Sequence, residues 1–235
     1  MIAPTYAVFG DLLSPACQSA LSERGVTPIL LPRFVPLPYP VCSHADMFFC
    51  KIGKYLVASP LYLDPLKPLA ELIRCELVYD RGDFKSGYPD EAKFNAFVIK
   101  NYVFCRKKTV SPKILEAAEA QSFHIVDVKQ GYAACSCAQA GFQAFITADR
   151  DLADKGVKNG FDVLLTEPGA IRTDVYPYGF IGGASGYYKN ALYFAGNIKK
   201  HPQYPSIYLF CKKNETKLVS LSEEPLTDVG GIRFF

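Results

Sequence analysis

Short runs of aromatic, aliphatic and small residues recur along the chain at nearly equal distances. They begin at residues 6, 55, 102, 145 and 192, which lie 49, 47, 43 and 47 residues apart. The runs are YAVF at 6–9, YLVA at 55–58, YVFC at 102–105, FITA at 145–148 and LYFA at 192–195. Each predicts a buried strand, because β-branched and aromatic residues are enriched there. A repeat of this length indicates an architecture of similar units.

A helix and then a second strand are predicted after each of these runs. The helices are expected at 14–24, 64–74, 111–122, 149–159 and 201–213. Ser14, Asp64 and Ser111 each precede a proline, which pairs a capping side chain with proline at the first helical position. Gly25 and Gly160 are expected in the left-handed conformation that ends a helix. The strands that follow are expected at 28–31, 77–79, 123–126, 161–165 and 217–221.

A third strand completes each unit. It is predicted before four of the markers, at 47–49, 96–99, 138–142 and 187–188, and its fifth copy is 232–235. We therefore expect one domain over residues 1–235, with repeats that begin near residues 1, 46, 95, 137 and 185. Residues 231–235 would close the ring by pairing with the first strand, which removes exposed sheet edges.

Composition agrees with a globular body that has a substantial core. Of 235 residues, 49% are hydrophobic, and the net charge is +3. No apolar run approaches the roughly 20 residues that cross a bilayer, and the N-terminal segment does not resemble a secretory signal. We expect a cytoplasmic protein that binds neither membrane nor nucleic acid, since its lysines are scattered. The eight cysteines are expected to be reduced thiols, and the sequence does not specify an oligomeric state.

A ring of five strand-strand-helix-strand units resembles the pentein fold, an α/β propeller with five-fold pseudosymmetry in the α+β class. This is the fold of the guanidino-group-modifying enzymes, which include arginine deiminase, agmatine deiminase and dimethylarginine dimethylaminohydrolase. The resemblance covers the whole chain. It implies a central channel that binds a small molecule, with the active site in the loops before the inner strands. A cysteine would attack the guanidinium carbon, a histidine would move protons and carboxylates would hold the cation.

The segment His44-Ala45-Asp46 resembles the His-x-Asp sequence that carries the catalytic histidine in those enzymes. On an extended segment, residues two apart point the same way, so both side chains can face the channel. A carboxylate beside an imidazole favours its charged form and fixes its orientation. His44 is thus the candidate acid/base, and Asp46 its orienting partner or a cation ligand. A structural histidine at the start of a strand is the alternative.

The nucleophile departs from the family pattern. In the deiminases it follows a glycine-rich turn near the C-terminus, where this chain reads Asp228-Val229-Gly230-Gly231-Ile232-Arg233 and has no cysteine. Cys135 lies at the analogous place in another unit, and Lys129 would lower its pKa. The alternative is that Cys135 and Cys137 are a buried structural pair. The family also allows a non-catalytic member that binds a ligand or a partner, as its ribosome anti-association factor does.

Other polar positions are candidates for substrate binding. They are Asp11, Asn95, Lys129, Asp149, Gly183, Ser185 and Asn197. The glycine-rich segment 179–188 leads into a strand rather than a helix, so it does not fit a nucleotide pyrophosphate. It fits close approach to a small ligand with Ser185 as a donor, or simply a tight turn. Asp11, Asp149 and Asn197 follow middle strands, where capping a helix is the alternative role.

We expect His44, Asp46, Cys135 and Ser185 to line one pocket if the loops before the inner strands converge. No cofactor and no metal are expected. A zinc site made by Cys42, His44, Cys135 and Cys137 is the alternative, although one intervening residue within each pair is less common than two.

Overall fold

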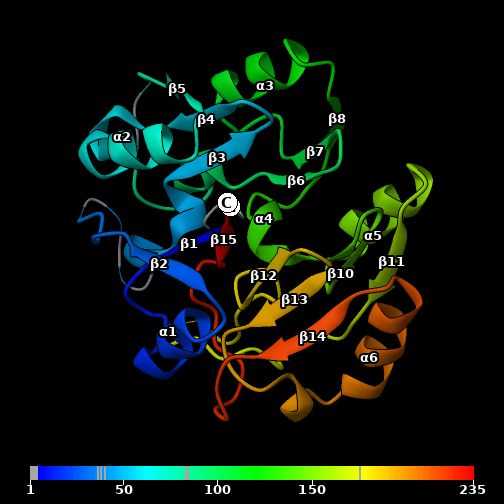
Figure 1. Ribbon diagram of the computed structural model, residues 1–235. Coiled ribbons are helices and arrows are strands. Elements are labelled where there is room, and N and C mark those ends of the chain that lie inside the picture. Colours follow the sequence, from blue (N-terminus) through cyan, green and yellow to red (C-terminus); the bar gives the residue numbers. More distant parts are fainter. Residues whose placement is uncertain (1–4, 36, 38, 40, 83–84, 175) are drawn as a thin grey trace.

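The computed structural model describes residues 5–35, 37, 39, 41–82, 85–174 and 176–235. Its strands form five separate three-stranded sheets placed around a common centre, with the long helices on the outside (Figure 1). In every sheet the inner strand pairs antiparallel with the middle strand, and the middle strand pairs parallel with the outer strand. The sheets do not merge into a barrel, so this is the predicted five-fold propeller.

The elements follow the predicted order. The middle strands are β1 (Thr5–Phe9), β4 (Tyr55–Ala58), β7 (Tyr102–Cys105), β10 (Ala144–Thr147) and β13 (Ala191–Phe194). The inner strands are β15 (Arg233–Phe234), β3 (Phe49–Ile52), β6 (Phe97–Ile99), β9 (Cys137–Gly141) and β12 (Ser185–Tyr188). The outer strands are β2 (Val26–Leu30), β5 (Glu76–Tyr79), β8 (His124–Asp127), β11 (Asp162–Leu165) and β14 (Lys217–Ser220).

Five helices connect the middle strands to the outer strands. They are α1 (Pro15–Ser22), α2 (Leu63–Leu72), α3 (Pro112–Glu119), α5 (Arg150–Lys158) and α6 (Tyr204–Lys213). A one-turn helix, α4 (Ala133–Ser136), precedes β9, and short 3-10 helices are η1 (Val41–Ser43), η2 (Ala45–Met47), η3 (Pro60–Tyr62), η4 (Asp90–Phe94) and η5 (Ile198–Lys200). Within the described part of the chain, no helix has both the length and the apolar character needed to cross a bilayer.

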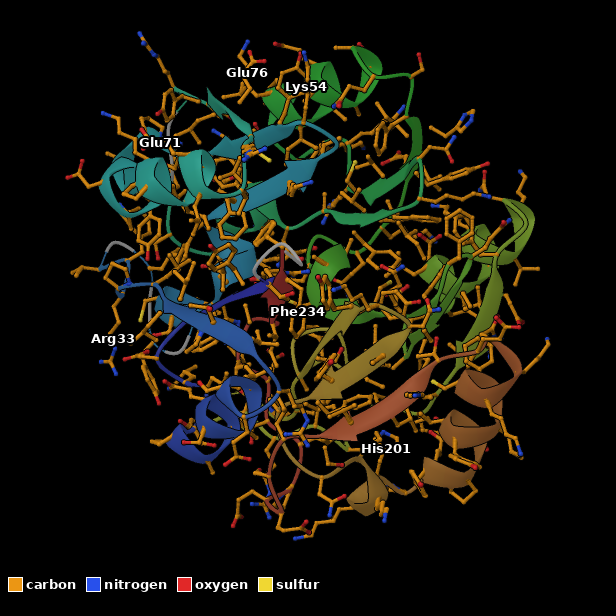
Figure 2. The ribbon with its side chains drawn as sticks, viewed as in Figure 1. Arg33, Lys54, Glu71, Glu76, His201 and Phe234 are labelled. Carbon is orange, nitrogen blue, oxygen red and sulfur yellow. The ribbon has the colours of Figure 1, made fainter. Side chains whose placement is uncertain are left out.

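The predicted closure of the ring is confirmed. β15 pairs antiparallel with β1, with Ala7 opposite Phe234 and Val8 opposite Arg233. The backbones of Tyr6 and Phe235 exchange two hydrogen bonds of 2.9 Å. The C-terminal strand therefore lies near the centre of the ring (Figure 1), where Figure 2 labels Phe234.

The core consists of apolar clusters shared between neighbouring sheets. One contains Phe97 and Phe104 from one sheet and Phe145 from the next, with Phe97 and Phe145 ring centroids 5.3 Å apart. Another joins Ala7 and Phe9 of β1 to Ala195, which follows β13, and thus joins the last sheet to the first. Labelled charged side chains such as Arg33 and Glu71 lie at the periphery (Figure 2). Burial of apolar side chains therefore holds adjacent units together.

The helix ends show which local predictions hold. Ser14 accepts a hydrogen bond from the Cys17 amide at 3.3 Å, and Ser111 accepts one from the Lys113 amide at 3.1 Å. Gly25 and Gly160 have φ of +73° and +81°, as expected for left-handed termini. The predicted cap at Asp64 is wrong, because α2 begins one residue earlier and Asp64 lies in its first turn.

The conformation around His44 also differs from the prediction. Residues 41–43 form η1 and residues 45–47 form η2, so His44, whose own backbone is extended, lies between two turns rather than in an extended segment, and β3 begins at Phe49 instead of Met47. The amide of His44 donates to the Val41 carbonyl, and that of Met47 donates to the His44 carbonyl, each at 3.0 Å. The Asp46 amide donates to the Gly230 carbonyl at 3.3 Å. These turn and tertiary hydrogen bonds outweigh the strand preference of the sequence, which is context-dependent.

Candidate functional site

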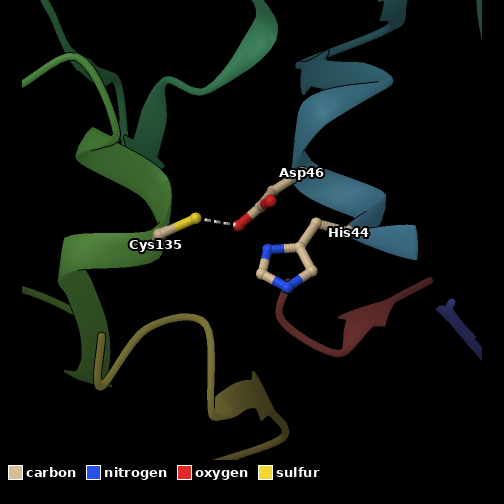
Figure 3. A group of neighbouring side chains, drawn as sticks. All are labelled: His44, Asp46 and Cys135. Atoms are coloured by element: carbon tan, nitrogen blue, oxygen red, sulfur yellow. Dashed lines mark hydrogen bonds between the residues drawn. The ribbon is translucent and has the colours of Figure 1, made fainter. Parts of the chain in front are cut away.

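Three side chains that are distant in sequence meet in the centre of the ring. His44 and Asp46 lie in the turns before β3, and Cys135 lies in α4 before β9. One ligand atom from each residue lies within 4.8 Å of those of the other two. The Cys135 thiol donates a hydrogen bond of 2.7 Å to Asp46 Oδ2 (Figure 3). All three residues are buried, with exposed fractions of 5%, 2% and 3%.

Asn95 holds Cys135 in place. Its Oδ1 accepts hydrogen bonds from the amides of Ala134 at 2.8 Å and Cys135 at 3.1 Å. Its Nδ2 donates to the Cys135 sulfur at 3.1 Å. Asn95 was expected to bind substrate, but the structure uses its amide group to fix α4 and the thiol.

Asp228 lies on the other side of His44. Its Oδ1 is 3.9 Å from His44 Nδ1 and accepts a hydrogen bond of 3.1 Å from the Gly230 amide. Its Oδ2 accepts one of 2.8 Å from the Phe180 amide. Burial raises the pKa of Asp228, and the neighbouring imidazole opposes that shift. Gly183 makes room for this carboxylate, because a Cβ at Gly183 would lie 2.0 Å from Asp228 Oδ1.

The environment of Cys135 favours the protonated thiol. Burial raises its pKa well above the usual value, the carboxylates of Asp46 and Asp228 add to the shift, and Asn95 opposes it. Lys129 is exposed, and its backbone amide donates to Asp151 at 2.8 Å. The prediction that Lys129 lowers the pKa of Cys135 is therefore wrong. The sequence placed the two residues near each other along the chain, but the lysine faces solvent.

Arg233 reaches the same carboxylate as the thiol. Its guanidinium lies 3.2 Å from Asp46 Oδ2. The second oxygen of Asp46, Oδ1, and Nε2 of His44 are buried without a hydrogen-bond partner among the described residues. Unpaired buried polar atoms are uncommon in folded proteins. The site therefore has unused bonding capacity at two of its three residues.

A cavity of about 530 Å³ opens beside His44 and Cys135, and we call it the His44 cavity. Asp228 and Glu91 also line it, and Glu91 accepts a hydrogen bond from the Tyr132 hydroxyl. Its aromatic residues are Tyr88, Tyr132, Tyr176, Tyr178 and Phe180. Carboxylates and aromatic faces both attract organic cations, so this cavity suits a positively charged small molecule.

A second cavity, of about 200 Å³, is lined by Asp46, Arg233, Lys51 and Ser185, and we call it the Arg233 cavity. It has no lining residue in common with the His44 cavity. The expectation that Ser185 lies in one pocket with His44 and Cys135 therefore does not hold. Ser185 donates its hydroxyl hydrogen bond to the Ile181 carbonyl at 2.8 Å, which fixes the turn before β12.

The remaining candidate ligands lie outside both cavities. Asp11 pairs with Arg33 at 2.6 Å and accepts a hydrogen bond from Ser43. Asp149 caps α5 by accepting from the Leu152 amide at 2.9 Å. Asn197 accepts from the Lys199 amide at 2.9 Å as the cap of η5. The alternative role of capping a helix therefore applies to Asp149 and Asn197.

The alternative zinc set of Cys42, His44, Cys135 and Cys137 does not assemble as such. Cys42 packs in an apolar cluster, and Cys137 lines the Arg233 cavity. In the described ranges, the group with metal-ligand geometry is His44, Asp46 and Cys135. Cys135 lies within α4 whereas Cys137 begins β9, so these two do not alternate along one strand as predicted.

Sequence reasoning missed Asp228, Glu91 and Arg233 as parts of the site. A signal existed for Asp228, because it stands just before Gly230 and Gly231, whose φ values of +74° and +78° mark a tight turn. Glu91 and the tyrosines of the His44 cavity lie in irregular segments without hydrophobic periodicity. Their positions depend on contacts between units.

Residues 11–233 match a protein family of unknown function, DUF6873. No curated protein sequence matches the chain.

Several solved structures share the arrangement of the whole chain. Dimethylarginine dimethylaminohydrolase, in an adduct with 4-chloro-2-hydroxymethylpyridine, has a TM-score of 0.54 and 8% identity over 93% of this chain and 92% of its own. Agmatine deiminase from C. jejuni has a TM-score of 0.53 and 10% identity over 92% and 87%. The inosamine-phosphate amidinotransferase of Streptomyces griseus has a TM-score of 0.55 and 10% identity over 91% and 75%.

These likenesses establish the fold alone, because the sequence identities are too low to carry over an activity. Five sheets of the same internal pairing, closed by β1 and β15, account for the match over most of each chain. The chain belongs to the DUF6873 family and is a divergent protein of the pentein fold.

Proposed function

We propose that this protein is a hydrolase or transferase that acts on a guanidino or amidino carbon–nitrogen group bound in the His44 cavity. The observation that carries the proposal is the meeting of His44, Asp46 and Cys135 within 4.8 Å beside a cavity with carboxylates and aromatic faces. Agmatine deiminase, dimethylarginine dimethylaminohydrolase and the amidinotransferase share the fold, and their names supply the substrate class.

The reaction would begin with the thiol of Cys135. A bound cation favours the thiolate, because an opposite charge nearby lowers the pKa of an acid. The proton passes to Asp46 Oδ2, which already accepts the thiol hydrogen bond at 2.7 Å. The sulfur then bonds to the guanidino carbon and forms a tetrahedral adduct.

Collapse of the adduct breaks a carbon–nitrogen bond, and the leaving amine takes a proton from His44. In a hydrolase, water next attacks the carbon while His44 accepts its proton. The carbon–sulfur bond breaks, and Cys135 recovers the proton held by Asp46. In a transferase, an acceptor amine takes the place of water. Asp228 stabilises the charged imidazole from 3.9 Å during the first half of the reaction.

A non-catalytic ligand-binding or partner-binding protein is the second candidate. It is favoured by the burial of Cys135, which keeps the thiol protonated, and by the absence of a cysteine in the segment 228–235. In this case the His44 cavity would bind the cation without chemistry.

An activity assay distinguishes the two candidates. It uses metal-free protein in the presence of a chelator. Agmatine, dimethylarginine, arginine and simple amidines are incubated with the protein, and amine release and ureido products are measured by mass spectrometry. We expect turnover that falls on the order of 1,000-fold or more in Cys135→Ser and persists in the matched Cys137→Ser variant. Unchanged turnover in Cys135→Ser would contradict the nucleophile. Saturable binding without product would favour the binding protein.

A further inference from the structure

We propose that His44, Asp46 and Cys135 form a binding site for Zn²⁺. The proposal concerns the residues of the proposed active site but depends on their geometry, not on catalysis. A bound ion would hold the sulfur and the imidazole that thiol chemistry needs, so the zinc form would be the inactive form of the protein.

The donor set fits zinc. Thiolate, imidazole and carboxylate are its usual protein ligands, whereas Ca²⁺ and Mg²⁺ prefer oxygen alone. Bond lengths of about 2.0 to 2.3 Å place neighbouring ligand atoms of a tetrahedral site roughly 3.5 Å apart. The ligand atoms here already lie within 4.8 Å of one another, so side-chain adjustments on the order of 1 Å would complete the site.

The unpartnered atoms are an independent indication of a missing ligand. Asp46 Oδ1 and His44 Nε2 are buried and accept or donate no hydrogen bond among the described residues. Asp46 keeps Arg233 on its other oxygen, at 3.2 Å, so Oδ1 is available to an ion without breaking that pair. A cation at this position would satisfy a buried carboxylate oxygen that otherwise loses its hydration without compensation.

The surrounding charges also favour a divalent cation. Asp46 and Asp228 are both buried close to the thiol, and their negative charges are part of what keeps Cys135 protonated. Binding of Zn²⁺ to the sulfur would displace the thiol proton of Cys135, and that proton would leave to the solvent. His44 and Cys135 line a cavity of about 530 Å³, which gives the ion a route inward and room for a water as fourth ligand.

Metal-free full-length protein tests the proposal by titration with Co²⁺, as a spectroscopic probe, and with Zn²⁺. We expect one ion per chain, a thiolate-to-cobalt charge-transfer band that Zn²⁺ abolishes, and release of about one proton per ion. Cys135→Ser should lose the band, and His44→Ala should weaken Zn²⁺ binding at least about 100-fold. Cys137→Ser is the matched control, since Cys137 is equally buried two residues away and should keep both properties.

The spectrum of the wild-type protein decides the question even if a variant fails to fold. Saturation with Co²⁺ without a charge-transfer band, or a band that persists in folded Cys135→Ser, would overturn the proposal. The zinc-binding result can be distinguished from the test of the proposed function, because turnover is measured in the presence of a chelator. Zinc binding without turnover would leave the zinc site standing alone, and turnover without zinc binding would remove the zinc site and keep the enzyme.

Discussion

The two cavities beside the Asp46–Cys135 hydrogen bond differ in charge and in the residues that line them. The His44 cavity contains Asp228, Glu91 and several tyrosines, whereas the Arg233 cavity contains Lys51 and Arg233 together with polar and apolar side chains. Asp46 lines the second and Cys135 lines the first, so the bonded pair connects two environments of opposite charge.

This difference explains how a carboxylate can stay buried at the centre of the ring. Arg233 supplies the compensating charge to Asp46 from one side, which leaves the acidic groups of the His44 cavity free to attract a cation from the other. Buried charges are tolerated when they are paired and hydrogen-bonded. The Arg233 cavity thus supplies the charge that compensates Asp46, and the His44 cavity is the one that we propose binds the ligand.

Among the substitutions that test this difference between the two cavities, removal of the Arg233 side chain is expected to have the largest effect. Arg233→Ala leaves Asp46 buried without its cation, so we expect the free energy of unfolding to fall by about 4 kcal/mol in urea denaturation. Arg233→Lys should recover part of the loss. Asp46→Asn in the Arg233→Ala background should recover more, since it removes the unpaired charge. A loss below about 1 kcal/mol would mean that the His44 side already compensates Asp46.

On the side of the His44 cavity, Gly183→Ala places a Cβ where it would lie 2.0 Å from Asp228 Oδ1. Asp228 is held by two backbone amides and cannot easily retreat, so we expect a loss of about 3 kcal/mol in the same assay. Gly169→Ala is the control: its φ is +100°, but among the described residues no atom beyond its two chain neighbours lies within 4 Å of the added Cβ. It should cost about 1 kcal/mol for the backbone alone. Equal losses would show that Asp228 is not closely packed.

The pH dependence of stability tests the burial of the Arg233 cavity through Cys50, which lines it. Burial raises the pKa of Cys50 to about 12, against about 8.5 in an unfolded chain. Only the unfolded thiol ionises between these values, so its contribution is complete below about pH 8.5 and is lost as pH rises. We expect Cys50→Ser to reduce the fall in unfolding free energy between about pH 8 and 10 by about 2 kcal/mol. If the unfolding free energy of Cys50→Ser depends on pH as in the wild-type protein, water reaches the Cys50 thiol.

Much of the fold was predictable because it depends on local chemistry that recurs in each unit. Ser14 and Ser111 cap helices next to a proline, and Gly25 adopts a positive φ in the turn that follows α1, all without help from distant residues. The closure of β1 by β15 followed from counting strands in each unit. Asp64 shows the limit of this reasoning, since the cap of α2 lies two residues earlier, at Tyr62.

The site was predictable only where the symmetry of the ring places loops together. That symmetry brought His44 and Cys135 to one cavity, although His44 lies between two short 3-10 helices and Cys135 lies in a helical turn. Arg233 and Glu91 were missed because their roles depend on partners contributed by other units, Asp46 and Tyr132. Lys129 was misplaced for the converse reason: closeness in sequence to Cys135 did not become closeness in space.

The pairing of β1 with β15 also has a consequence for cooperativity. In a linear array of repeats, the outermost unit has one neighbour and can fray on its own. Here the cluster around Ala7, Phe9 and Ala195 gives the first and last units the same two-sided support as the others. Loss of any one unit would expose apolar faces on both of its neighbours, so the ring is expected to unfold in a single transition rather than from an end.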